Sequence, residues 1–316
     1  MSSTVVLDEE QQADRFDELV RRLSRQSVEK HFDAYVDVPW DDPACAIDPC
    51  DPRWELDPDR GLGATDWYRN QPADVRARIG LHGIVANMKA GLQFESILKR
   101  GLLEFAFQLP DRSPEFRYAY HEVIEEAQHA LMFQEFVNRS GLDAPGLTWD
   151  LKLGARRVIG FSRRFPALFF VFVLGGEDPI DHVQRTALRS GRELHPLLER
   201  IMRIHVTEEA RHLSFARQYL RTTVPRLGRW RRNAIAFQAP LILAVMSSVM
   251  MRPPRSLVRA YDIPKDVIAQ AYGPGSQARE DVRQSLRKVR QLLSELGLVT
   301  PAARRLWRAF GIWDEQ

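Results

Sequence analysis

Apolar residues recur every three or four positions along most of this chain, which is the repeat of one face of an α-helix. Few segments show the two-residue alternation of a half-buried strand, so the pattern predicts an all-α protein. The predicted helices span 8–32, 73–108, 113–138, 151–191, 195–223, 234–251, 281–296 and 301–310.

Serine, proline and glycine mark the expected helix ends. Ser113 precedes Pro114, so we expect it to be the N-cap of the helix over 113–138. Pro166 and the string GGEDP at 175–179 are expected to break or kink the helical region over 151–191.

Residues 34–70 depart from the helical pattern. They are rich in proline, aspartate and glycine and cannot sustain a long helix. So long a loop is unusual in a compact domain, and we expect it to wrap over the helices with Trp40, Trp54 and Trp67 as anchors. No internal linker is visible, so one domain is predicted over 1–316. Its parts are an N-terminal helix with a covering loop (1–70), a metal-binding bundle (71–223) and C-terminal helices (224–316).

The composition of the 316 residues is ordinary for a globular protein, with 44% hydrophobic and 28% charged residues. A net charge of +3, from 45 basic and 42 acidic residues, gives no reason to expect nucleic acid as a partner. Two cysteines, Cys45 and Cys50, make no disulfide framework, and the first residues lack the layout of a signal peptide. We therefore expect a cytoplasmic protein.

The most apolar stretch covers 234–251. Gln238, Pro240 and two serines interrupt it, and it is short of a convincing membrane span. We expect a buried core or interface helix and no membrane, with a membrane-associated segment as the alternative.

Two Glu-x-x-His strings carry the candidate chemistry. Glu126 and His129 form the first, and Glu209 and His212 form the second. Residues three apart share a helix face, so each carboxylate and imidazole can bind one metal ion. One such pair alone is common on solvated helix faces, but apolar residues follow both pairs here.

Each string also follows a lone acidic residue in an apolar segment. Glu95 lies 31 residues before Glu126, and Glu177 lies 32 residues before Glu209. One Glu from each of two helices and one Glu-x-x-His from each of two others is the pattern of a dinuclear site in a four-helix bundle. We therefore predict a ferritin-like four-helix bundle core with additional helices. Oxygen and imidazole ligands favour two iron ions, with manganese as a possible substitute.

Glu177 has a competing interpretation. Asp178 is able to N-cap a helix that begins at Pro179, which would leave Glu177 outside that helix. The interpretation we favour is a kinked ligand helix through the glycines and the proline.

His205 extends the second string. It lies four residues before Glu209 and seven before His212, so the three side chains share one face. A single histidine on an apolar face is more often a core residue. Because this face is the proposed metal face, we predict that His205 is a ligand.

Neighbouring polar residues are candidates for orienting the ligands. Arg211 is expected to pair with Glu125, and Gln128 to reach Glu208 or a ligand carboxylate. A surface charge pair is the alternative for Glu208. Asp181 is a candidate acceptor for a ligand imidazole. No catalytic side chain beyond the metal centre is predicted.

On these residues the chain resembles the p-aminobenzoate N-oxygenase family of non-haem diiron arylamine oxygenases. The added histidine one turn before the last Glu-x-x-His separates that family from ferritins and acyl desaturases. The resemblance covers about 10–300 and rests on Glu95, Glu126-x-x-His129, Glu177 and His205-x-x-x-Glu209-x-x-His212.

The resemblance implies a homodimeric enzyme that activates O2. It would oxidise a small aromatic or related primary amine toward the hydroxylamine, nitroso or nitro compound. No flavin or iron–sulfur motif is present, so electrons are expected from a separate ferredoxin or reductase.

Substrate residues are harder to predict. Met88, Gly91 and Leu92 form an apolar wall on the Glu95 face, with room at Gly91, and they are the candidate pocket. The same residues suit plain helix core. No nearby Arg or Lys is an obvious clamp for a substrate carboxylate.

Three other functions remain open. The closest alternative is carbon hydroxylation or desaturation of a hydrophobic substrate on the same metal core. An iron-storage protein is disfavoured by the length of the chain. A radical-generating subunit would need a tyrosine beside the metals, and Tyr118 and Tyr120 lie off the predicted face of Glu126.

Overall fold

The computed structural model describes residues 2–313, and this part of the chain contains helices and no strand, which confirms the all-α prediction. The helices are α1 (Ser2–Glu29), α2 (Asp66–Arg69), α3 (Ala73–Ala106), α4 (Pro114–Ser140), α5 (Trp149–Arg164), α6 (Pro166–Arg189), α7 (Pro196–Thr223), α8 (Arg229–Met251), α9 (Arg255–Ala260), α10 (Lys265–Tyr272), α11 (Gln277–Ser285), α12 (Arg287–Glu295) and α13 (Pro301–Ala309).

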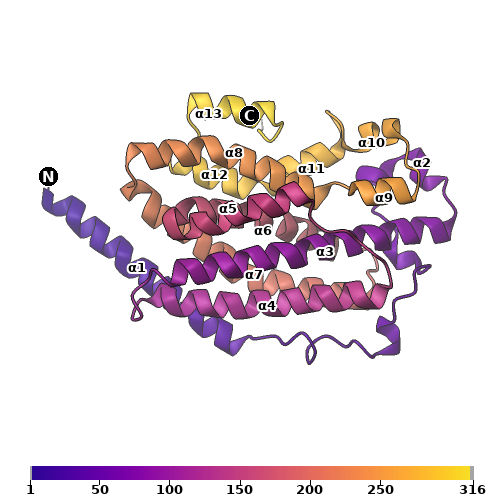
Figure 1. Ribbon diagram of the computed structural model, residues 1–316, viewed down its shortest axis with the longest axis horizontal. Helices are drawn as coiled ribbons and strands as arrows, with labels where there is room; N and C mark the ends of the chain where they lie inside the picture. Colours follow the sequence, from indigo (N-terminus) through magenta and orange to yellow (C-terminus); the bar gives the residue numbers. More distant parts are fainter. Residues whose placement is uncertain (1, 314–316) are drawn as a thin grey trace.

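Four long helices surround the predicted site. α3 packs along α4 and α6 packs along α7, with further contacts from α4 to α7 and from α3 to α6. Figure 1 shows α3 and α4 running side by side through the middle of the molecule. The arrangement is consistent with a ferritin-like helical fold. Ser113 caps α4 as predicted, because its hydroxyl accepts a hydrogen bond from the Phe116 N–H.

The predicted break at 175–179 is absent. Pro166 begins α6 as expected, but the helix then continues through GGEDP with Pro179 inside it. The glycines serve close packing instead, because a Cβ on Gly176 would lie 1.9 Å from the Phe94 ring. Asp178 therefore caps no helix, and Glu177 lies within α6. Burial of the helix between α3, α7 and α8 offsets the hydrogen bond that Pro179 cannot donate.

The segment between α1 and α3 covers one side of the bundle. It contains three short 3-10 helices, at Pro43–Cys45, Pro52–Trp54 and Gly61–Ala64, besides α2. Trp40 and Trp54 are buried as expected, whereas Trp67 is only half-buried. Figure 1 shows the segment running beneath α4 toward α2.

α5 and the C-terminal helices form a second layer. α5 packs on α3 and α6, and α8 packs on α6 (Figure 1). The helix predicted over 281–296 is two helices, because Leu286 leaves helical geometry and buries its side chain.

α8 contains the apolar stretch identified in the sequence. The segment Arg229–Ala260 is long and apolar enough to cross a membrane by length and composition, with 44% of its apolar window buried. Ile235, Ala239 and Leu243 are buried in the main hydrophobic core, which favours the core-helix interpretation.

Candidate metal centre

The structure brings the predicted ligand side chains together in the middle of four helices. α3 and α6 each supply one glutamate, and α4 and α7 supply the two Glu-x-x-His pairs with the extra histidine. Their ligand atoms form overlapping groups in which all atoms lie within 4.8 Å of one another. None is more than 2% exposed: Glu95, Glu126, His129, Glu177, His205, Glu209 and His212.

Glu126 and Glu209 occupy the centre of the group. His212 Nδ1 lies 3.1 Å from Glu126 Oε1 and 3.2 Å from Glu209 Oε1. His129 Nδ1 lies 3.2 Å from Glu126 Oε2 and 3.4 Å from Glu209 Oε1. Both carboxylates therefore lie between the two imidazoles, at the centre of the group.

His205 lies at one end of the group. Its Nε2 is 3.7 Å from Glu95 Oε1 and 3.7 Å from Glu209 Oε1. Its ring centroid is 4.6 Å from that of His129. The extra histidine thus faces the same space as the residues of the paired strings.

Several buried polar atoms of the group have no hydrogen-bond donor or acceptor among the described residues. They include both oxygens of Glu177, Oε2 of Glu95, Oε2 of Glu209 and Nδ1 of His205. Unpartnered buried polar atoms are costly and rare in folded proteins. Carboxylate oxygens and imidazole nitrogens without hydrogen-bond partners are suitable ligand atoms for iron or manganese ions.

Burial and crowding perturb the ionisation of these groups. Burial, reinforced by neighbouring carboxylates, raises the pKa of Glu95 and of Glu177 well above the usual range. Burial lowers the pKa of His205 well below its ordinary value, and His129 adds to that effect. His205 is therefore a neutral imidazole, which is the form that binds metal.

In the first Glu-x-x-His string the pKa shifts have the opposite sign, because glutamate and histidine stabilise each other's charged forms. Burial alone would lower the pKa of His129, but hydrogen bonds to Glu126 and Glu208 raise it to about 10. Burial alone would raise the pKa of Glu126, but His212 and His129 hold it well below its ordinary value. Without metal, His129 thus carries a proton that it must lose to bind an ion, whereas Glu126 is already ionised.

A carboxylate from the opposite helix orients each of these two histidines. Nε2 of His129 donates to Oε2 of Glu208 at 2.9 Å, and Nε2 of His212 donates to Oε2 of Glu125 at 2.7 Å. Nδ1 of each ring is left facing the centre. Arg211 lies between the two carboxylates, 2.8 Å from Glu125 and 3.5 Å from Glu208.

The expected Arg211–Glu125 pair is therefore present. Glu208 is completely buried, so its interpretation as half of a surface charge pair is wrong.

Two other expected contacts are absent. The side chain of Gln128 accepts from the Ala34 N–H and donates to Asp33, so it holds the start of the covering segment rather than the centre. Asp181 accepts from Arg185 Nε at 2.6 Å, one helical turn away on α6, and contacts no ligand imidazole. The expectation that Asp181 accepts a hydrogen bond from a ligand imidazole is therefore wrong, because Arg185 pairs with this carboxylate instead.

Glu122 was missed by the sequence reasoning. It is 1% exposed, and one of its oxygens lies within 4.8 Å of the ligand atoms of Glu126 and His212. Burial raises its pKa to about 8, although His212 acts in the opposite direction. The signal was available, because Glu122 lies four residues before Glu126 and seven before His129, as His205 does in the second string.

The residues of the candidate substrate wall do not border a described cavity. Met88 is buried in the hydrophobic core, and Leu92 packs against the same cluster. The space beside Gly91 is taken by the Phe133 ring, which a Cβ there would approach to 3.2 Å. None of the three lines a described cavity, so the expectation of room at Gly91 is wrong.

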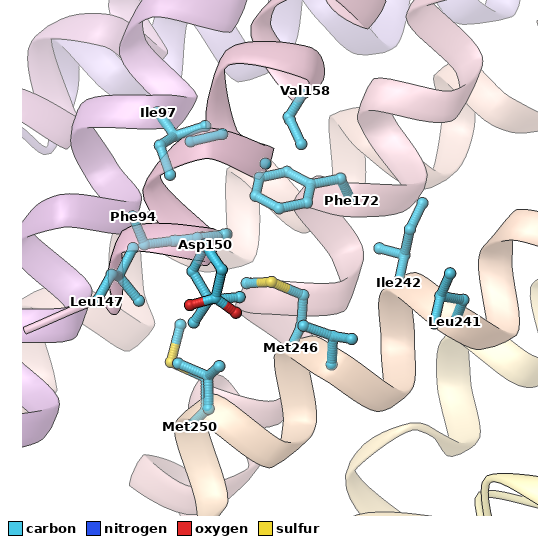
Figure 2. Close-up of a pocket in the computed structure, with 15 residues that line it drawn as sticks. Phe94, Ile97, Leu147, Asp150, Val158, Phe172, Leu241, Ile242, Met246 and Met250 are labelled. Carbon is cyan, nitrogen blue, oxygen red and sulfur yellow. The ribbon is translucent and has the colours of Figure 1, made fainter. Parts of the chain in front are cut away.

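An apolar cavity of about 200 Å³ lies instead on the outer side of α3 and α6, closed by α5 and α8. Figure 2 shows Phe172 and Met246 reaching into the same space from α6 and α8. Phe94 also lines the cavity. It adjoins Glu95 in sequence, and its ring lies against Gly176, the neighbour of Glu177. Phe94 thus belongs to the cavity lining and is also close in the chain, or in space, to the segments that carry Glu95 and Glu177.

Charged groups are scarce in that cavity. Asp150 is the one charged residue of the described lining, which contains no Lys or Arg. A hydrogen bond from Thr148 lowers the pKa of Asp150, so this carboxylate is ionised at neutral pH. Its side chain is exposed, which places it at the mouth of the cavity.

Comparisons with known proteins show the family of the chain. The family model for the p-aminobenzoate N-oxygenase AurF matches residues 13–297, so the chain belongs to that family. Similar proteins include the uncharacterized proteins Rv0885 of Mycobacterium tuberculosis (strain H37Rv) and Mb0909 of Mycobacterium bovis. Each is 41% identical over 291 residues, which cover 92% of this chain and 86% of the relative. No solved structure matches.

Proposed function

We propose that this member of the p-aminobenzoate N-oxygenase family is a diiron monooxygenase that uses O2 to oxidise a primary aromatic amine. The observation that carries the proposal is the buried group of four glutamates and three histidines, with several ligand atoms left unpartnered. A buried carboxylate and imidazole set of this kind has little structural value without ions.

Glu126 and Glu209 would help to hold both ions, because each lies between the two paired imidazoles. Glu95 and Glu177 would bind from the opposite helices. Two iron ions bound there would supply the electron transfer and the oxygen activation, with manganese as a possible substitute. The protein's own part is to fix the ligands, exclude water and place the amine.

Glu125, Glu208 and Arg211 support that arrangement. The two carboxylates hold the imidazoles with Nδ1 toward the centre, and Arg211 balances their charge without entering the centre.

The substrate class follows from the cavity beside Phe94. Its apolar walls suit an aromatic ring, and a volume of about 200 Å³ admits a small one. Asp150 at the mouth would attract an amine and repel an anion. We therefore expect a preference for an uncharged or cationic arylamine over p-aminobenzoate.

Oxidation of the amine to the hydroxylamine needs two electrons and two protons besides O2, and it releases one water. Two cysteines cannot hold an iron–sulfur cluster with four thiolate ligands, so a separate ferredoxin or reductase would reduce the centre between turnovers.

Carbon hydroxylation or desaturation of a hydrophobic substrate is the second candidate. The observation that favours it is the nearly uninterrupted apolar lining of the same cavity.

A single-turnover reaction under ¹⁸O2 tests the proposal. The protein is loaded with ferrous iron without oxygen, mixed with aniline, p-toluidine, p-aminobenzoate or toluene, and analysed by mass spectrometry. We expect up to about one ¹⁸O-labelled hydroxylamine per chain from the uncharged amines and less from p-aminobenzoate, because two ferrous ions supply two electrons. The Glu126→Ala protein is the control.

Labelled hydroxytoluene or benzyl alcohol without any N-oxidised product would favour the second candidate. Iron oxidation with no organic product from any compound in the panel would contradict both.

A further inference from the structure

The metal-facing side of α4 carries one more carboxylate than the Glu-x-x-His pattern requires. Glu122, Glu126 and His129 stand at i, i+4 and i+7, so their side chains share one face of the helix. His205, Glu209 and His212 have the same spacing on α7. The two helices therefore present equivalent triplets that differ only at the first position.

The two triplets lie side by side in opposite order, so that the first residue of each is near the last residue of the other. His129 lies beside His205, with ring centroids 4.6 Å apart, and Glu122 groups with His212 at the other end. The exchanged hydrogen bonds, from His129 to Glu208 and from His212 to Glu125, follow the same two-fold relation. Glu122 thus occupies the place that corresponds to His205 in the other half of the centre.

The surroundings of Glu122 leave its carboxylate available. The side chain is 1% exposed, and neither oxygen has a hydrogen-bond partner among the described residues. The other buried glutamates near it, Glu125 and Glu208, have Arg211 and a histidine as partners. A buried carboxylate without such partners is costly unless it takes up a proton or binds a cation.

We propose that Glu122 is an eighth ligand of the centre, binding one iron ion together with Glu126 and His212. The inference rests on the metal centre of the proposed function. It makes the centre asymmetric: the ion at the His129 end is beside a second imidazole, from His205, whereas the ion at the His212 end is beside an added carboxylate.

Metal titration and Mössbauer spectroscopy of the Glu122→Gln protein test this inference without any turnover. Gln keeps the size of the side chain and removes its charge. We expect the affinity for the second ferrous ion to fall at least about tenfold, as judged by competition with a chelator. In the ⁵⁷Fe(II) protein, one quadrupole doublet should change while the other keeps its parameters.

Two further variants keep the test decisive. Glu122→Leu also removes the carboxylate and should lower the affinity for the same ion. It provides the test in case Gln disturbs the packing. Asp181→Asn is the matched control, because Asp181 is an equally buried carboxylate that pairs with Arg185 instead of facing the centre.

Unchanged affinity and two unchanged doublets in both Glu122 variants would overturn the role of Glu122 and leave the proposed function intact. A wild-type protein that does not bind two iron ions would overturn the proposed function itself.

Discussion

Single residues set the direction in which the two paired histidines face. Each donates Nε2–H to a carboxylate of the opposite helix, which leaves Nδ1 for the centre. Arg211 contacts both of these carboxylates and is itself 5% exposed. The orientation of His129 and His212 therefore depends on residues that are not ligands themselves, as in other metal sites with carboxylate–histidine pairs.

Replacing Glu208 by Gln should reduce metal affinity about 10- to 100-fold, because an amide orients the His129 ring less firmly and lowers its basicity. Competition titration with a chelator measures the change. Glu135→Gln is the control, since Glu135 lies on the same helix as His129 and pairs with the exposed Arg139. Equal affinities of the wild-type and Glu208→Gln proteins would contradict the orienting role.

At the scale of elements, four ligand helices hold the centre and two outer helices create the cavity. α5 and α8 both pack on α6, and Phe94 lines the cavity and lies against Gly176, the neighbour of Glu177. If the amine binds in this cavity as proposed, its binding depends on α8 as well as on the helices of the centre.

Val245→Trp in α8 should fill part of the cavity and lower kcat/KM for an arylamine at least about tenfold, which corresponds to ~1.4 kcal/mol of transition-state binding. Iron content should stay at the wild-type value. Phe237→Trp is the matched control, because Phe237 is exposed on the same helix and lies outside the cavity lining. Equal loss in both variants, or no loss in either, would place the substrate elsewhere.

The sequence predicts the helices, and which candidate side chains share a helix face, because both depend on spacing within one helix. The i, i+3 and i+4 repeats fix which side chains share a face, whatever that helix packs against. The cavity depends on packing between helices distant in sequence, so the open space expected at Gly91 is filled by Phe133. A break at 175–179 is wrong for the same reason, since α6 runs through these residues and close packing against Phe94 explains the glycine at 176. The interpretation of Glu177 as part of one helix through the glycines and the proline agrees with the continuous α6.

At the scale of the whole molecule, the oligomeric state and the division of the chain into parts both stay predictions. Exposed apolar side chains on α8 and α5, among them Leu241 and Leu153, suit the homodimer that we expect. The division of the chain into parts ending near 70 and 223 also stays a prediction.

The most direct test of the whole account is the anomalous scattering of iron-loaded crystals above and below the iron absorption edge. We predict two iron peaks per chain, about 3.5–4 Å apart, among the four ligand helices. The peaks should be enclosed by Glu95, Glu126, His129, Glu177, His205, Glu209 and His212. A single peak there, or iron bound only at the surface, would contradict the dinuclear centre.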